Sequence, residues 1–182
     1  RVGNMIQKYF DGVVPEAACA SSFTTEGTED TEGGQEFAWD ALTGRVVGEA
    51  ARAMDAPDLA GSVRAGIEIS NMVDGFVAST RPFSIAKEIE KGTHADPERG
   101  KADLTSILYQ AAEALRIASL LLYPVMPSKM AELWRNWNCE HLNDPNDPDS
   151  GFVAPLEELA AWGGAYSLKP GQRISKGEVR FM

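Results

Sequence analysis

The chain has few cysteines, no long apolar run and, over one stretch, no basic residue at all. Its 182 residues include two cysteines, Cys19 and Cys139, which excludes a dense disulfide framework and suits a reducing compartment. No run of 18 or more apolar residues is present, and the polar first twenty residues lack the apolar centre of a secretory signal. These absences predict a cytoplasmic protein without a membrane span, and two free thiols.

Positive charge is scarce as well. The formal net charge is −10, which argues against binding nucleic acid through a broad basic surface. From Tyr9 to Gly44 there is no Lys or Arg but there are eight carboxylates. Within this stretch, residues 21–34 (SSFTTEGTEDTEGG) are rich in Gly, Thr and Glu and predict a flexible acidic loop, because the oxygen-ligand spacing of a calcium-binding EF-hand loop is not met. Any recognition of nucleic acid must therefore be local.

Apolar residues recur at helical spacing over most of the remaining chain. With 43% apolar and 24% charged residues, a chain of this length is sufficient for one domain with a sizeable core. We predict a single all-α domain over 1–182, a bundle of about five helices with an extended C-terminal segment. The predicted helices are 2–10, Gln35 to Met54, Asp58 to Thr80, 83–90, Lys101 to Leu122 and Ser128 to Trp137. Gly61, Gly66 and Gly75 are expected to allow close approach between helices.

No motif in the chain predicts chemistry of its own. Cys139 and His141 could give a metal two ligands, but a structural zinc site needs four. The glycines match neither a P-loop nor a dinucleotide fingerprint, and no nucleophile elbow is visible. We therefore expect no catalytic residue, no metal site and no cofactor within this chain.

Two junctions between helices carry a family resemblance. RPFSIAKEIEKG (81–92) joins two helices through a Pro-Phe pair, and LLYPVMPSKMAELW (121–134) joins a long helix to the next through two prolines. In these motifs, their order and their spacing, the chain resembles the methionyl-tRNA synthetases. The likeness covers the C-terminal anticodon-binding region of that family and extends over the whole chain apart from the acidic loop. It implies a helical anticodon-binding bundle.

The resemblance implies four RNA-binding residues. RVGNMIQKYF (1–10) is similar to the family's first anticodon helix, so that Arg1 matches an Arg whose Asn partner would lie upstream of this chain, and the helix would be truncated at its N-terminus. Phe83 stands where the family has a Trp that stacks on an anticodon base, a role that a smaller ring can keep with less overlap. Arg81 and Lys87 flank Phe83 and would face the phosphate backbone. The structural alternatives are a terminal charge for Arg1, a core position for Phe83 and ordinary surface charges for the two cations.

Two further expectations concern architecture. The family's second junction implies that Tyr123, Met126 and Trp134 fill the bundle core. The closing stretch GQRISKGEVRFM (171–182) is similar to a segment that returns along the domain toward the catalytic region, with Ile174, Val179 and Phe181 as its buried side.

The resemblance also implies an activity for a longer protein. That enzyme would be a methionine–tRNA ligase, using ATP and Mg²⁺ on an N-terminal catalytic domain absent from this chain. The partners would be the tRNA with the methionine anticodon and that catalytic domain, and the fragment itself would be a non-catalytic monomer. Two alternatives stay open: the anticodon domain of another class I synthetase, which charging specificity would reveal, and a helical protein-interaction module without RNA binding, which the acidity favours.

Overall fold

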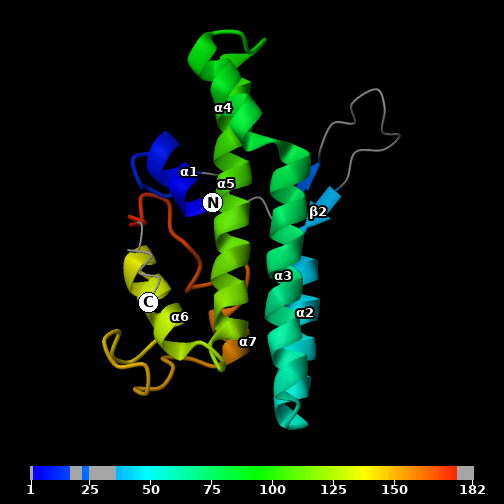
Figure 1. Ribbon diagram of the computed structural model, residues 1–182, viewed down its shortest axis with the longest axis vertical. Helices are drawn as coiled ribbons and strands as arrows, with labels where there is room; N and C mark the ends of the chain where they lie inside the picture. Colours follow the sequence, from blue (N-terminus) through cyan, green and yellow to red (C-terminus); the bar gives the residue numbers. More distant parts are fainter. Residues whose placement is uncertain (1, 17–21, 25–35, 176–182) are drawn as a thin grey trace, which may run out of the picture.

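The computed structural model describes residues 2–16, 22–24 and 36–175, and it confirms the all-α prediction (Figure 1). Arg1, Cys19, most of the acidic loop and the closing residues from 176 onward lie outside the described residues. The elements are α1 (Val2–Tyr9), β1 (Ser22–Thr24), β2 (Glu36–Ala38), α2 (Trp39–Asp55), α3 (Leu59–Thr80), α4 (Pro82–Lys91), α5 (Pro97–Leu122), α6 (Pro127–Trp137) and α7 (Leu156–Leu159).

Helix α5 is the centre of the fold. From Leu104 to Leu121 nearly all of its side chains are buried, as expected for a helix covered on every side. Helices α3 and α4 pack against it directly, and α2 lies behind α3 (Figure 1). On the other side of α5 lie α1, α6 and the return segment, which we define as residues 165–175.

Local capping sets where the helices begin. Helix α5 starts at Pro97, four residues before the predicted Lys101, because the Asp96 side chain accepts a hydrogen bond from the backbone nitrogen of Arg99 at 3.1 Å and Pro97 fits the first helical position. Asp58 caps α3 in the same way by accepting from Gly61 N at 2.9 Å. Helix α6 likewise begins on a proline, Pro127.

The predicted start of the second helix was wrong. Residues 36–38 form β2, which pairs antiparallel with β1 in the register Phe23↔Phe37, so α2 begins at Trp39 rather than Gln35. The Phe37 ring packs against Trp39 and Phe76, with ring centroids 5.8 and 4.9 Å away. This aromatic cluster and the strand pairing together favour an extended backbone before the helix.

Only part of the glycine prediction is confirmed. A methyl group on Gly66 would lie 2.7 Å from Leu122 Cγ and 3.2 Å from the carbonyl oxygen of Ala118, so α3 and α5 approach closely there. Gly61 also faces neighbouring atoms, because an added methyl group would lie 3.0 Å from Ala53 Cβ. Gly75, however, has nothing within 4 Å of such a methyl group. It faces open space, and the packing role predicted for it was wrong.

The prediction for the proline junction holds for two of its three bulky residues. Trp134 is buried, and the half-buried Tyr123 ring stacks on it with centroids 5.0 Å apart. Met126 is 40% exposed, contrary to the prediction. Its backbone, with φ −136° and ψ 52°, is not helical, so Met126 is the N-cap residue of α6 and lies outside the helix face that packs on the bundle.

The return segment crosses from α6 to the chain that follows α1. Val13 and Arg173 form an antiparallel bridge, Val14 N donates to Gln172 O at 2.8 Å, and Ile174 N donates to Gly12 O at 2.7 Å. Ile174 is buried, as predicted, whereas Val179 and Phe181 lie outside the described residues. Backbone pairing therefore joins the two ends of the described chain.

A buried ion pair holds the same segment to α5. Glu113 and Arg116 have no solvent exposure, and the guanidinium donates to both carboxylate oxygens at 3.0 and 2.7 Å. Arg116 also donates to the carbonyl of Leu159 at 2.6 Å, and Glu113 accepts from the backbone nitrogen of Leu168 at 2.9 Å. The pair therefore fixes α7 and the return segment against the central helix.

Candidate nucleic-acid interface

Arg81 and Phe83, two of the four predicted RNA-binding residues, lie at the corner between α3 and α4. Arg81 ends one helix and begins the other with φ 48° and ψ 50°, a left-handed conformation that costs a non-glycine residue about 1–2 kcal/mol. Its backbone nitrogen donates to Val77 O at 3.2 Å, while its carbonyl accepts from Ser84 N at 2.9 Å. One residue in a left-handed conformation thus ends α3 and begins α4.

The corner presents Phe83 to solvent. Pro82 and Ala86 are buried and hold α4 against the bundle, and the residue after Pro82 is rotated about 100° around the helix axis. Phe83 is accordingly 50% exposed, which contradicts the alternative that it is a core residue. It lines a depression of about 420 Å³ with Asp74, Val77, Ala78, Arg81 and Ser84.

The structure brings only some of the predicted residues together. Arg81 and Phe83 share the depression. Lys87 is exposed one turn further along α4 and lies outside the residues that line it. Among residues 2–16, 22–24 and 36–175, no carboxylate forms an ion pair with Arg81 or Lys87. Arg1 lies outside the described residues, and the RNA contacts of all four remain predictions.

Sequence reasoning missed Asp74, which places a carboxylate in the same depression. The sequence spacing could have indicated this position. One face of α3 and its C-terminal cap carries residues at intervals of three, one and three, namely Asp74, Val77, Ala78 and Arg81. The site is therefore mixed in charge rather than basic.

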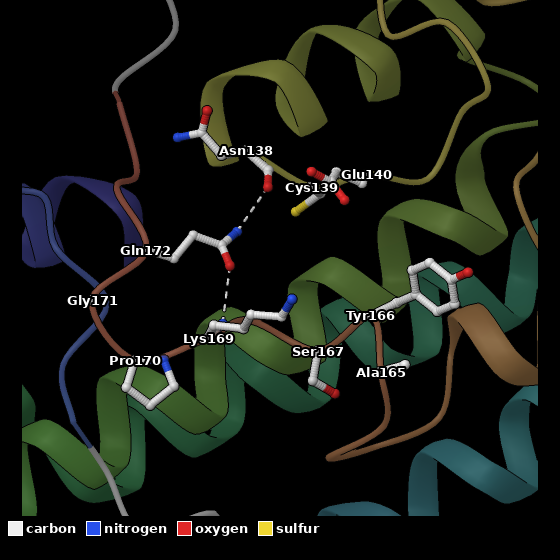
Figure 2. Close-up of a pocket in the computed structure, with 10 residues that line it drawn as sticks. All are labelled: Asn138, Cys139, Glu140, Ala165, Tyr166, Ser167, Lys169, Pro170, Gly171 and Gln172. Carbon is white, nitrogen blue, oxygen red and sulfur yellow. Dashed lines mark hydrogen bonds between the residues drawn. The ribbon is translucent and has the colours of Figure 1, made fainter.

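A second hollow, of about 380 Å³, lies between the end of α6 and the return segment (Figure 2). Polar groups line much of it, including Glu140, Tyr166, Ser167 and Lys169. The Gln172 side chain crosses one end of the hollow and is hydrogen-bonded on both sides, to Asn138 O at 3.1 Å and to Lys169 N at 3.0 Å. Sequence reasoning gave no indication of this hollow, because the two segments that form it are far apart in the chain.

Cys139 and His141 lie near this hollow in a setting that disfavours charge. Burial raises the pKa of the Cys139 thiol to about 12, which keeps it protonated and unreactive. Burial, assisted by the charge of Arg116, lowers the pKa of His141 to about 3. In the part of the chain that the structure describes, no three Cys, His, Asp or Glu side chains gather as a metal site would require.

The low pKa of His141 predicts a pH-dependent stability. Its ordinary pKa is 6.5, so below that pH the unfolded chain binds a proton that the folded chain takes up only near pH 3. Stability should therefore fall as the pH drops from about 6.5 toward 3, by roughly 2 kcal/mol at pH 5 from this group. His141→Phe should remove this contribution and so reduce the pH dependence, because a phenyl ring can occupy the site facing Trp134 without titrating. The free energies of unfolding of both proteins at pH 5 and 7.5 test this, and equal pH slopes would contradict it.

Within the described residues, no helix is long and apolar enough to cross a membrane. No family model matches the chain.

Comparison with curated proteins finds methionine–tRNA ligases. The chain is 34% identical to the ligase of Streptomyces coelicolor over 184 aligned residues, which cover all of this chain and 29% of the ligase. It is 31% identical to the ligase of Deinococcus radiodurans, covering all of this chain and 21% of that protein. For Sulfolobus acidocaldarius the identity is 25%, over 99% of this chain and 25% of the ligase.

Among solved structures, methionyl-tRNA synthetase of Mycobacterium tuberculosis, in complex with methionyl-adenylate, matches the fold. The TM-score is 0.58 at 20% identity, over 97% of this chain and 28% of that one. The chain thus spans less than a third of the length of each relative named here. Along its whole length it is homologous to one part of the methionine–tRNA ligases.

Proposed function

We propose that this chain is the anticodon-binding part of a methionine–tRNA ligase and that Phe83 stacks on an unpaired anticodon base. The half-exposed ring of Phe83, displayed beside a depression at a strained helix corner, is the observation that carries the proposal. Residues in strained backbone conformations cluster at functional sites, so the left-handed Arg81 beside Phe83 supports a functional role for this corner. Each relative named above is a methionine–tRNA ligase, which favours methionine over the amino acids of other class I synthetases.

The chemistry of the corner suits a single-stranded loop of RNA. Stacking of a base on an aromatic side chain contributes about 1–3 kcal/mol and tolerates any ring with an open face. Arg81 and Lys87 supply positive charge within one turn of Phe83, and a guanidinium can donate two parallel hydrogen bonds to a phosphate or a base edge. In a protein with net charge −10, these local cations would offset the repulsion of the phosphate backbone.

In this proposal the ligase activates methionine with ATP and Mg²⁺ in a catalytic domain outside this chain and transfers it to tRNA in the cytoplasm. No residue of this chain takes part in that chemistry. The chain contributes selection, because a cognate anticodon held at the α3–α4 corner orients the tRNA for transfer.

Phe83→Ala in the ligase that carries this chain tests the proposal. We expect aminoacylation to lose efficiency (kcat/KM for tRNA) by at least tenfold, the factor that corresponds to about 1.4 kcal/mol of lost stacking. Methionine-dependent exchange of pyrophosphate into ATP should be unchanged, because no tRNA takes part in it. Phe83→Trp should keep or improve aminoacylation, since a larger ring overlaps more of the base.

Phe152→Ala is the matched control, because Phe152 is another exposed phenylalanine but lies in the loop after α6. It should leave both activities near their original values. Equal losses of aminoacylation and pyrophosphate exchange on Phe83→Ala would instead indicate a folding role. Unchanged aminoacylation on Phe83→Ala would favour the protein-interaction module, to which the acidity of the chain is well suited.

A further inference from the structure

Gln172 occupies a junction where three parts of the fold meet. Its side-chain nitrogen donates to the carbonyl of Trp137 at 2.6 Å. The same nitrogen donates to the carbonyl of Asn138 at 3.1 Å, and the side-chain oxygen accepts from Lys169 N (Figure 2). Its own backbone carbonyl accepts from Val14 N at 2.8 Å. The half-buried side-chain amide of Gln172 therefore connects the end of α6 to the return segment, while its backbone carbonyl joins the same residue to the chain that follows α1.

The end of α6 also lies beside the N-terminal end of α1. Trp137 is buried, and a methyl group placed on Gly3 would lie 3.9 Å from Cζ2 of its ring. The first turn of helix α1 thus lies beside the Trp137 ring, and the chain after its last turn is joined to the return segment, where Ile174 N donates to Gly12 O. The side chain of Gln172 holds the carbonyl of the same Trp137 whose ring faces α1.

Helix α1 depends on such contacts for its position. With eight residues it is too short to be stable by itself. Val2, Met5 and Ile6 bury one face against the bundle, chiefly against α5. An ion pair between Lys8 and Glu90 at 3.5 Å links α1 to α4. Both side chains are more than half exposed, and such a surface pair fixes orientation weakly.

We propose that Gln172 is a positioning residue for RNA recognition, which orients α1 through Trp137 and the backbone pairing at residues 12–14. This inference rests on the proposed function, because α1 matters to RNA only if this end of the bundle reads the anticodon. Gln172 makes no contact with RNA in this proposal. It acts by keeping α1 in register with α4, whose first turn carries Phe83.

The test uses Gln172→Ala and Gln172→Glu in the ligase that carries this chain. The Glu side chain has the same shape but, as a carboxylate, cannot donate to the carbonyls of Trp137 and Asn138. Both variants should raise the KM for tRNA about fivefold to tenfold. The kcat of aminoacylation and the pyrophosphate exchange should stay within about twofold, because misplacement of α1 weakens binding without touching the catalytic domain.

A second measurement reads the position of α1 without any RNA. Hydrogen exchange of the amides of residues 2–14 should be faster in both variants than in the original protein, while amides in the middle of α5 should be unchanged. Asn143→Ala is the matched control, since Asn143 also donates its amide to a backbone carbonyl, Ser150 O at 3.0 Å, but in a loop remote from α1. It should alter neither the KM nor the exchange at residues 2–14.

Unchanged exchange at residues 2–14 would overturn the inference whatever the function of the chain. Faster exchange with an unchanged KM for tRNA would also overturn it. In that second case the Phe83→Ala result separates the two ideas. If Phe83→Ala lowers the efficiency of aminoacylation, the proposed function still stands. If it does not, both the proposed function and the inference about Gln172 are wrong.

Discussion

Replacing Arg116 by methionine should lower the free energy of unfolding of this chain by about 3–5 kcal/mol, because Glu113 would remain buried without its cation. The guanidinium gives two hydrogen bonds to that carboxylate and a third to the carbonyl of Leu159. Methionine fills much of the same volume but donates none of them. Guanidinium chloride unfolding, followed by circular dichroism, measures the loss.

Two further variants show whether burial is the cause. The double variant Glu113→Gln with Arg116→Met should recover part of the loss, because no charge is then left without a partner. Arg45→Met breaks an exposed network with Glu49 and Glu68 and should cost far less, since solvent screens those charges. If Arg116→Met and Arg45→Met were equally mild, the interpretation of the buried pair would be wrong.

Phe76→Ala should destabilise the chain by about 3–5 kcal/mol, the usual cost of truncating a buried phenylalanine. The Phe76 ring has no solvent exposure and packs edge-on against Phe37 and Trp39, so its removal opens a cavity in the aromatic cluster between α2 and α3. Urea unfolding of the variant and the original chain gives the difference.

Phe83 is the natural comparison, because it follows Phe76 by seven residues, beyond the α3–α4 corner, and has half of its surface exposed. Phe83→Ala should change stability by less than about 1 kcal/mol. This result matters for function as well, since it would show that lost aminoacylation on Phe83→Ala does not come from unfolding. A large loss of stability on Phe83→Ala would contradict the exposed position.

The strongest helical patterns predicted the fold well, whereas helix boundaries depended on contacts that no pattern contains. Leu104, Ile107, Leu108, Ala111 and their successors repeat so regularly that the central helix was evident, and the structure buries that stripe. The true start at Pro97 required recognising Asp96 as a cap within a polar connector. The delayed start of α2 depends on pairing with β1, a tertiary contact that overrides local propensity.

The candidate site was harder to predict from the sequence, because the exposure of a side chain depends on the segments that pack around it. A phenylalanine after a proline is equally compatible with core and surface, and only the burial of Pro82 and Ala86 turns Phe83 outward. Glu113 and Arg116 show the opposite case. An acid and a base three residues apart are typical of a solvated helix face, yet the return segment and α7 cover both side chains. The packing of distant segments decided each of these positions.

The bridge between Val13 and Arg173 has a consequence for biosynthesis. During translation, Val13 leaves the ribosome long before Arg173. The chain that follows α1 is therefore exposed before the residues that pair with it have been made. Contacts between such distant positions form late and slow the folding of a domain. The chain that follows α1 should therefore stay unpaired, and open to chaperones and proteases, until residue 175 has left the exit tunnel, and only then should it pair with the return segment.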